Sequence, residues 1–394
     1  MSRENEKIDS VTFHQQHAGK IAVTSKVNIT SEEDLSVVYT PGVSEVCKAI
    51  ANDENKVNAL TARGNMIAVV TDGTAVLGLG DIGPKAALPV MEGKSILFKQ
   101  MAGLDAFPIC LDTTHTEEII AITKALQPNF AGINLEDISA PRCFEIEARL
   151  KEELDIPVFH DDQHGTAIVV LAALTNALKL VEKVHYDVKI VINGAGSAGI
   201  AIAKLLLEAG YSNISLVSLE GVLCRGESWL NATQNDIATR TNLTEQRGTL
   251  DDVIEHADVF IGVSGPLALT QAHIKTMRAN PIIFALANPV PEIYPEDAIA
   301  AGAAVVGTGR SDYPNQINNL LAFPGIFKGI LNAQSKHITM ETKVAAAHAI
   351  ASVIPESELN ESFIIPSALN PNVTTAVAQA VEMHARQELA LLTN

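Results

Sequence analysis

Short apolar runs alternate with helix-like stretches along the first 160 residues of the chain. The spacing of apolar residues predicts a helix at 116–127 and short strands at 37–39, 66–70, 95–99, 107–111 and 131–133. Strands that alternate with helices are typical of α/β folds. We therefore expect residues 1–162 to form an N-terminal α/β domain.

A second pattern begins after residues 165–183, a stretch that is apolar on more than one face. Such a helix is expected to be buried and to cross from the first domain into the second, 163–394. The chain then runs as strand, glycine-rich turn, helix and strand over 188–217, a βαβ unit. Further strands are predicted at 259–263, 282–285 and 304–307. This order predicts a Rossmann-like, doubly wound parallel sheet.

The tail of the chain carries two alanine-rich helical patterns, 343–353 and 374–391. Their apolar residues recur every three or four positions, which indicates helices with one buried face. We expect them to be C-terminal packing helices.

Composition narrows the class of function. The chain of 394 residues has a formal net charge of −18, and its Lys and Arg residues are scattered, so a groove for nucleic acid is not expected. No apolar run reaches the roughly 18 residues of a membrane span. The four cysteines form no CxxC pair and the N-terminus lacks the apolar core of a signal peptide, which favours the cytoplasm. Small-molecule chemistry is the remaining class.

A G-x-G-x-x-G motif follows the strand at 188–192 and opens a helix, as dinucleotide binding requires. Its members are Gly194, Ala195, Gly196, Ser197, Ala198 and Gly199. The first glycine permits a tight turn, the second lets a pyrophosphate approach the backbone, and the third allows close packing of the helix. A glycine-rich turn without a ligand is the alternative.

The choice of cofactor depends on the end of the next strand. An acid normally stands there to bind the ribose of NAD, yet Ser218 occupies the position and Glu220 follows two residues later. Since no Arg or Lys adjoins Ser218 to pair with a 2′-phosphate, we favour NAD, with NADP as the alternative. Ser264 lies in a turn expected to pass under the nicotinamide ribose, although a plain turn explains it nearly as well.

Two pairs of carboxylates follow strand-like runs. Asp161 and Asp162 come between the apolar run 157–160 and a Gly-Thr helix start, and Glu136 and Asp137 follow 131–133. Ligands of open α/β folds bind at the carboxyl ends of strands, and carboxylates suit Mg²⁺ or Mn²⁺. A helix cap or a solvated pair is the alternative. The flanking His160 and His164 are interpreted as structural.

Several segments together resemble the malic enzyme family in its short bacterial form. Tyr39 and Lys94 carry little weight alone, because most such residues pack or are solvated, but both fall in matching segments. The segments are VVYTPGV (37–43), TDGTAVLGLGDIGPKAALPVMEGK (71–94), NLEDI (134–138), PVFHDDQHGTA (157–167), NGAGSAGIA (193–201), ALANP (285–289) and TGRSDYPNQINNLLAFPG (308–325). They cover most of residues 20–330 in family order.

The resemblance implies a role for each matching residue. Lys94 matches the general base that takes the proton of the malate C2 hydroxyl, with its pKa lowered by a nearby metal and positive surroundings, and Asp161 matches its partner. Tyr39 matches the general acid that protonates C3. The implied metal ligands are Glu136, Asp137 and Asp162, and the amides implied to bind substrate and cofactor are those of Asn288 and Asn319. A structural cap remains open for Asn318.

The implied activity is oxidative decarboxylation of L-malate to pyruvate by a homodimer that uses NAD and Mg²⁺ or Mn²⁺. An oxaloacetate decarboxylase, an NADP-preferring enzyme and a non-catalytic relative are the alternatives. The large eukaryotic forms carry an Arg for the substrate carboxylate within the segment that here reads 72–76. Because this chain lacks it, we expect Asn side chains and helix N-terminal amides to bind that carboxylate.

Overall fold

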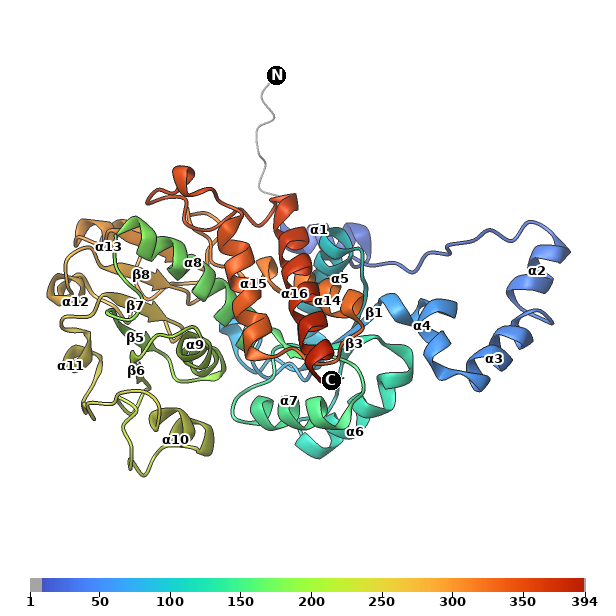
Figure 1. The fold of residues 1–394 in the computed structure, drawn as a ribbon, viewed down its shortest axis with the longest axis horizontal. Coiled ribbons are helices and arrows are strands. Elements are labelled where there is room, and N and C mark those ends of the chain that lie inside the picture. The colour runs from blue at the N-terminus through green and yellow to red at the C-terminus, as the bar shows by residue number, and fades with distance from the viewer. Residues whose placement is uncertain (1–8, 393–394) are drawn as a thin grey trace, which may run out of the picture.

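Two parallel sheets make up the computed structural model, which describes residues 9–392 (Figure 1). The expectation about a signal peptide rests partly on residues 1–8, which lie outside this range. The first sheet has the order β2-β1-β3-β4. Its strands are β1 (Met66–Thr71), β2 (Asp105–Cys110), β3 (Gly132–Leu135) and β4 (Val158–His160).

Helices cover both faces of the first sheet, and the alternation along β1 shows which residues face which layer. Ala68 and Val70 pack with the helices α6 (Thr116–Leu126) and α7 (Arg142–Glu153). Ile67 and Val69 face the opposite layer, formed by α5 (Pro84–Ala102) and α14 (Phe323–Ala333). Both faces of a parallel sheet are normally covered in this way.

The second sheet has the order β6-β5-β7-β8-β9, with every neighbouring pair parallel, so the predicted Rossmann-like sheet is confirmed. Its strands are β5 (Lys189–Asn193), β6 (Asn213–Val217), β7 (Val259–Gly262), β8 (Ile282–Ala285) and β9 (Val305–Thr308). Its helices are α9 (Ser197–Glu208), α10 (Ala232–Ala238), α11 (Leu250–Ile254), α12 (Gln271–Thr276) and α13 (Pro295–Ala300). The strand order reverses between β5 and β7, where ligands of this fold bind.

A continuous apolar core joins the two sheets. The helix α8 (Thr166–Leu180) is buried along most of its length between α9 and α15 (Met340–Ser352), as its apolar sequence predicts. The helices α15 and α16 (Pro371–Leu392) are packing helices, and α16 lies along α14 (Figure 1). Phe323 and Phe327 of α14 pack against Phe98 of α5 with their rings at steep angles to it. Residues from the end of the chain therefore complete the core of the first sheet.

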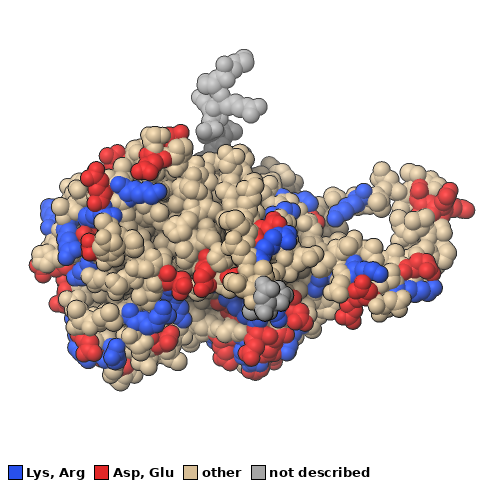
Figure 2. Space-filling view, viewed as in Figure 1, with Lys and Arg blue, Asp and Glu red and all other residues tan. Residues whose placement is uncertain are grey.

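The N-terminal residues form an arm that projects from this body. After α1 (Ser10–His17) the chain runs out to α2 (Glu32–Val38) and returns through α3 (Val43–Asn52) and α4 (Val57–Leu60) to β1 (Figure 1). We call residues 21–60 the arm. Figure 2 shows it as a lobe of its own. None of α2, α3 and α4 contains a buried residue.

Two predicted strands are wrong. The run 37–39 ends the helix α2, because Ser31 and Asp34 form a capping box that starts a helix. The run 95–99 lies inside α5, with Pro84 in its first turn. A short apolar run fits a buried helix as well as a strand, so periodicity alone gave the wrong element. No helix within residues 9–392 has the length and apolar character needed to cross a membrane.

Candidate active site

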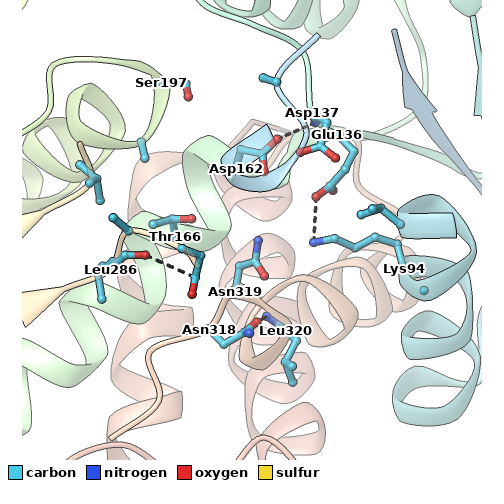
Figure 3. Close-up of a pocket in the computed structure, with 18 of the residues that line it drawn as sticks. Lys94, Glu136, Asp137, Asp162, Thr166, Ser197, Leu286, Asn318, Asn319 and Leu320 are labelled. Atoms are coloured by element: carbon cyan, nitrogen blue, oxygen red, sulfur yellow. Dashed lines mark hydrogen bonds and ion pairs between the residues drawn. The ribbon is translucent and has the colours of Figure 1, made fainter. Parts of the chain in front are cut away.

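The carboxyl ends of the two sheets face each other across a cleft of ≈ 810 Å³. Figure 3 shows Lys94 of α5 pointing toward the acids that follow β3 and β4, with Ser197 at the opposite side. The predicted site residues that line the cleft are Lys94, Glu136, Asp137, Asp162, Ser197, Ala198, Ser264, Asn288 and Asn319. Its volume falls in the range of ligand sites.

Three carboxylates converge at one end of the cleft. The nearest oxygens of Glu136, Asp137 and Asp162 all lie within 4.8 Å of one another. Asp162 Oδ2 also accepts the backbone N–H of Asp137 at 2.7 Å, which joins the loops after β3 and β4. Burial raises the pKa of Glu136 well above its usual value, and Asp162 and Asp161 add to this effect against the opposing charge of Lys94. Such a set of oxygen ligands fits a hard divalent cation.

Lys94 is buried among acids. Its Nζ lies 3.0 Å from Glu136 Oε1, forms an ion pair with Asp161, and sits 4.5 Å from the centre of the Phe323 ring. Burial acts to lower the pKa of Lys94, but the charges of Asp161, Glu136 and Asp162 outweigh it, so the pKa is raised. The expected positive surroundings that would lower this pKa are therefore not found among the protein groups.

A single π-helical turn, Asp161–Gly165, places the acid pair. Asp161 is fully buried and does not line the cleft, whereas Asp162 faces it and is 30% exposed. Gly165 makes this possible, because a Cβ there would overlap Asp161 Oδ1 and lie 3.0 Å from Asn319 Cβ. The two neighbouring acids therefore have different surroundings, one beneath Lys94 and one in the cleft.

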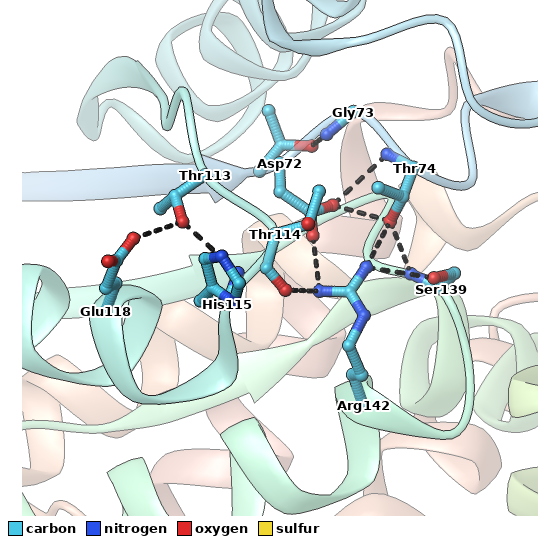
Figure 4. Close-up of polar contacts among 10 residues, drawn as sticks. Asp72, Gly73, Thr74, Thr113, Thr114, His115, Glu118, Ser139 and Arg142 are labelled. Atoms are coloured by element: carbon cyan, nitrogen blue, oxygen red, sulfur yellow. Dashed lines mark hydrogen bonds and ion pairs between the residues drawn. The ribbon is translucent and has the colours of Figure 1, made fainter.

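The Arg142 side chain links three loops of the first sheet through hydrogen bonds, which Figure 4 shows. Its Nη1 donates to Asp72 Oδ2 at 2.7 Å and to the Thr114 carbonyl at 2.8 Å. Its Nη2 donates to Thr74 Oγ1 and Ser139 Oγ, both at 3.0 Å. These contacts connect the segments after β1, β2 and β3, and they bring the 72–76 segment beside the loop of Asp137. No motif in the sequence marks this role of Arg142.

The glycine-rich turn after β5 has the conformation expected for a dinucleotide site. Gly194 has a φ of 122°, which side chains rarely adopt, and a Cβ at Gly199 would overlap the Gly194 carbonyl oxygen. A Cβ at Gly196 would meet nothing within 4 Å, so the backbone there is open to a ligand. Ser197 and Ala198 begin α9 and line the cleft.

A buried carboxylate holds the other turns of the second sheet. Glu292 Oε1 accepts the backbone N–H of Ser264 at 2.9 Å, and its Oε2 accepts that of Ala287 at 3.1 Å. Ser264 Oγ in turn accepts from Asn193 Nδ2 at 2.9 Å. Burial raises the pKa of Glu292, while these backbone donors favour its charged form. Sequence reasoning missed Glu292 because no motif surrounds it.

Ser218 and Glu220 lie at the carboxyl end of β6, beside the glycine-rich turn but outside the lining of the cleft. Ser218 Oγ donates to Glu220 Oε2 at 2.8 Å, and the backbone N–H of Glu220 donates back to Ser218 Oγ at 3.2 Å. These hydrogen bonds hold the carboxylate of Glu220 beside Ser218, the position at the strand end where an acid normally stands.

Tyr39 is not brought to the cleft of its own chain. It follows the last residue of α2, in the arm, and 67% of it is exposed. Two residues that sequence reasoning missed do line the cleft, His14 of α1 and Lys20. Lys20 Nζ donates to the Pro89 carbonyl at 2.7 Å.

The histidines beside the acid pair do not line the cleft, which agrees with their structural interpretation. His164 lies between Glu147 Oε1 at 2.8 Å and Lys343 Nζ at 3.0 Å, and burial lowers its pKa to about 3. Asn318 is a cap, since its Oδ1 accepts the backbone N–H of Leu320 at 3.0 Å.

Comparison with known proteins identifies the family. The N-terminal domain of malic enzymes matches residues 17–151, and the NAD binding domain of malic enzymes matches residues 163–386. The fold and site are thus those of a two-domain protein with a dinucleotide-binding second sheet. The chain belongs to the malic enzyme family.

Individual relatives match over nearly the whole chain. An NAD-dependent malic enzyme of Geobacillus stearothermophilus is 60% identical over 94% of this chain and 77% of its own length. A bifunctional malic/malolactic enzyme of Bacillus subtilis is 55% identical over 95% of this chain and 91% of its own length. The crystal structure of an NAD-dependent malic enzyme from Thermotoga maritima has 51% identity and a TM-score of 0.92, over 95% of this chain and 99% of that one.

Proposed function

We propose that this protein oxidises and decarboxylates L-malate to pyruvate and CO₂, with reduction of NAD and with a divalent cation. The observation that carries the proposal is the position of Lys94. It lies between Asp161 and Glu136, in a cleft that also contains the carboxylate trio and the start of α9. The relatives named as NAD-dependent malic enzymes support it.

Each side chain has a defined part in the reaction. Lys94 takes the proton of the C2 hydroxyl. The nicotinamide, when bound, would accept the hydride that C2 loses. The C3–C4 bond of the resulting oxaloacetate then breaks, CO₂ leaves, and Tyr39 gives a proton to C3. Glu136, Asp137 and Asp162 would hold the cation, which would polarise the C2 oxygen and offset the negative charge around Lys94. Asp161 orients Lys94 through their buried ion pair.

The substrate carboxylate has one candidate partner that the sequence did not indicate, Lys20. Lys20 lines the cleft together with Lys94, and Asn288 and Asn319 line it as well. We assign the amides of Asn288 and Asn319 to substrate and cofactor and the charge of Lys20 to the substrate carboxylate.

We place the boundary between the two domains at residue 162. This division puts the loops of Glu136, Asp137 and Asp162 in the first domain, and α8 and the cofactor sheet in the second.

Glu220 supports the choice of NAD. A carboxylate held by Ser218 at the end of β6 can accept hydrogen bonds from ribose hydroxyls, whereas it repels a 2′-phosphate. Glu220→Gln is expected to lower kcat/KM for NAD relative to that for NADP. An unchanged ratio of the two values would contradict this assignment.

The test of the function uses the purified protein with malate, Mn²⁺ and each nicotinamide cofactor, with pyruvate, lactate and reduced cofactor measured. Pyruvate and NADH should appear in equal amounts, and Lys94→Ala should abolish both. Consumption of oxaloacetate without any cofactor reduction from malate would instead support the oxaloacetate decarboxylase. Near-normal turnover by Lys94→Ala would refute the base.

A further inference from the structure

The turns that follow β7 and β8 line the cleft on the side of the second sheet, and Figure 3 shows Leu286 opposite Lys94. In the sheet, β5 lies between β6 and these two strands. A dinucleotide crosses the strand ends at such a point, with its pyrophosphate at the start of α9 and its adenosine ribose at the end of β6. The nicotinamide half is therefore expected over the turns after β7 and β8. The residues of these turns that line the cleft are Val263, Ser264, Gly265, Pro266, Leu286, Ala287 and Asn288.

One buried carboxylate, that of Glu292, is bonded to both turns. Glu292 lies between β8 and α13 and is fully buried. Its Oε1 accepts the backbone N–H of Ser264 at 2.9 Å, and its Oε2 accepts that of Ala287 at 3.1 Å. Among residues 9–392, no Lys or Arg forms an ion pair with it. Because a buried charge is costly unless it is hydrogen-bonded, these backbone donors are what keep the carboxylate in place.

This pattern of bonds requires two acceptor atoms on one side chain. A carboxylate accepts at both oxygens, whereas the amide of a glutamine accepts at one atom and donates at the other. The donor of a glutamine at this position would therefore face the backbone N–H of Ser264 or of Ala287. The end of β7 also leaves room for the carboxylate, since a Cβ at Gly262 would lie 2.4 Å from Glu292 Cδ.

The two hydrogen bonds set the orientation of two peptide groups at the cleft. In a trans peptide the C=O points opposite to the N–H. Because the N–H groups of Ser264 and Ala287 point to Glu292, the carbonyls of Val263 and Leu286 point away from it. All four of these residues line the cleft, while Glu292 itself does not. Glu292 thus acts on the surface of the cleft from behind it.

Two further hydrogen bonds extend this network. The Leu286 carbonyl accepts from Asn288 Nδ2 at 3.4 Å, and Ser264 Oγ accepts from Asn193 Nδ2 at 2.9 Å. Asn193 is the last residue of β5 and precedes the glycine-rich turn. The ends of β5, β7 and β8 are therefore joined through one buried side chain.

We infer that Glu292 is a positioning residue of the cofactor site, which holds the turns after β7 and β8 in the conformation that binds the nicotinamide riboside half of NAD. The inference rests on the proposed function for the identity of the cofactor. It goes further in assigning the two halves of the cofactor to separate supports. The nicotinamide half depends on Glu292, whereas the adenosine and pyrophosphate part depends on α9 and the end of β6.

The test measures the binding of NAD and of ADP to Glu292→Gln by titration calorimetry, with circular dichroism to verify the fold. ADP carries the adenosine and two phosphates but lacks the nicotinamide riboside. NAD should bind about 10-fold more weakly, the lower end of what one lost hydrogen bond to a charged group costs, while the affinity for ADP stays unchanged. The matched control is Glu296→Gln, an exposed carboxylate of α13 outside the cleft, which should keep both affinities.

A second variant displaces the carboxylate without removing its charge. Gly262→Ala places a Cβ against Glu292 and should likewise weaken NAD binding and spare ADP binding. Since both substitutions act on one contact, their effects on NAD binding should not add in the double variant. Wild-type affinity for NAD in both single variants would overturn the inference. Equal weakening of NAD and ADP would overturn it as well, because that result indicates a general loss of structure.

Kinetics separate this inference from the proposed function. In Glu292→Gln the KM for NAD in malate oxidation should rise, whereas decarboxylation of added oxaloacetate with Mn²⁺, which needs no hydride acceptor, should continue at the wild-type rate. Equal loss of both reactions would overturn the positioning role. A wild-type protein that binds NAD but forms no NADH from malate would refute the proposed function alone, and the ratio of NAD to ADP affinity would still decide the role of Glu292.

Discussion

Replacement of Arg142 by Met is expected to destabilise the protein by removing the charge that pairs with Asp72. The Asp72 side chain is fully buried, while Arg142 is 26% exposed. Loss of one partner from a buried ion pair costs about 3–5 kcal/mol. Asp72 keeps the hydrogen bonds from the backbone and hydroxyl of Thr74, which places the loss near the lower end. About 3 kcal/mol corresponds to a roughly 150-fold change in the unfolding equilibrium.

The assay is urea unfolding followed by circular dichroism and by tryptophan fluorescence, with Mn²⁺ titrations of the native state. Arg149→Met is the matched control, because Arg149 lies on the same helix, α7, and pairs with Glu117 and Glu153 at the surface. Exposed pairs contribute little to stability. Arg142→Met should also weaken Mn²⁺ binding, since Thr74 and Ser139 hold the loop of Asp137.

A double variant tests the physical cause. If an unpaired buried charge produces the loss, Asp72→Asn in the Arg142→Met background should restore part of the stability, and the two single effects should not add. If Arg142→Met lowers the free energy of unfolding no more than Arg149→Met does, the reasoning is refuted. Additive losses in the double variant would show that packing of the arginine, rather than its charge, is responsible.

Three further perturbations have defined outcomes. Asp162→Asn should raise the Mn²⁺ concentration needed for half-maximal activity while NAD affinity stays unchanged, and unchanged Mn²⁺ dependence would remove Asp162 from the ligand set. Gly165→Ala should lower kcat, because its Cβ displaces Asp161, and a wild-type kcat would contradict this. Burial lowers the pKa of Lys343 from 10.5 to about 7, so the unfolded chain binds more protons between these values and stability rises with pH there. In urea unfolding at pH 6 and pH 9, the free energy of unfolding of Lys343→Met should rise less with pH than that of the wild type. An equal rise in the two proteins would refute this prediction.

The sequence predicted the second sheet well, because its signals are local. Strand, glycine-rich turn and helix follow one another around Gly194. The observed β5 lies within one residue of the predicted strand 188–192, and α9 begins inside the predicted motif, at Ser197. The apolar stretch at 165–183 is likewise found as the buried helix α8. The carboxylates at 136–137 and 161–162 could be placed together, since both pairs follow parallel strands of one sheet.

Contacts distant in sequence were not predictable in this way. Arg142 reaches Asp72 across 70 positions, and Glu292 reaches Ser264 across 28, without any spacing that marks them. The strand predicted at 95–99 failed because a five-residue apolar run carries no period of its own. The position of Tyr39 depends on the path of the exposed arm, which no local pattern in the sequence marks.

The shared core around α8 and α14 restricts how this protein can be recombined with others. Phe323 and Phe327 come from beyond the cofactor sheet, yet they pack on Phe98 beneath the first sheet. A chimera that takes its cofactor half from another sequence therefore also changes the residues packed against Lys94, because Phe323 contacts that lysine. Grafting a new cofactor preference would succeed best within 194–310, with α8 and everything after residue 320 kept from the host.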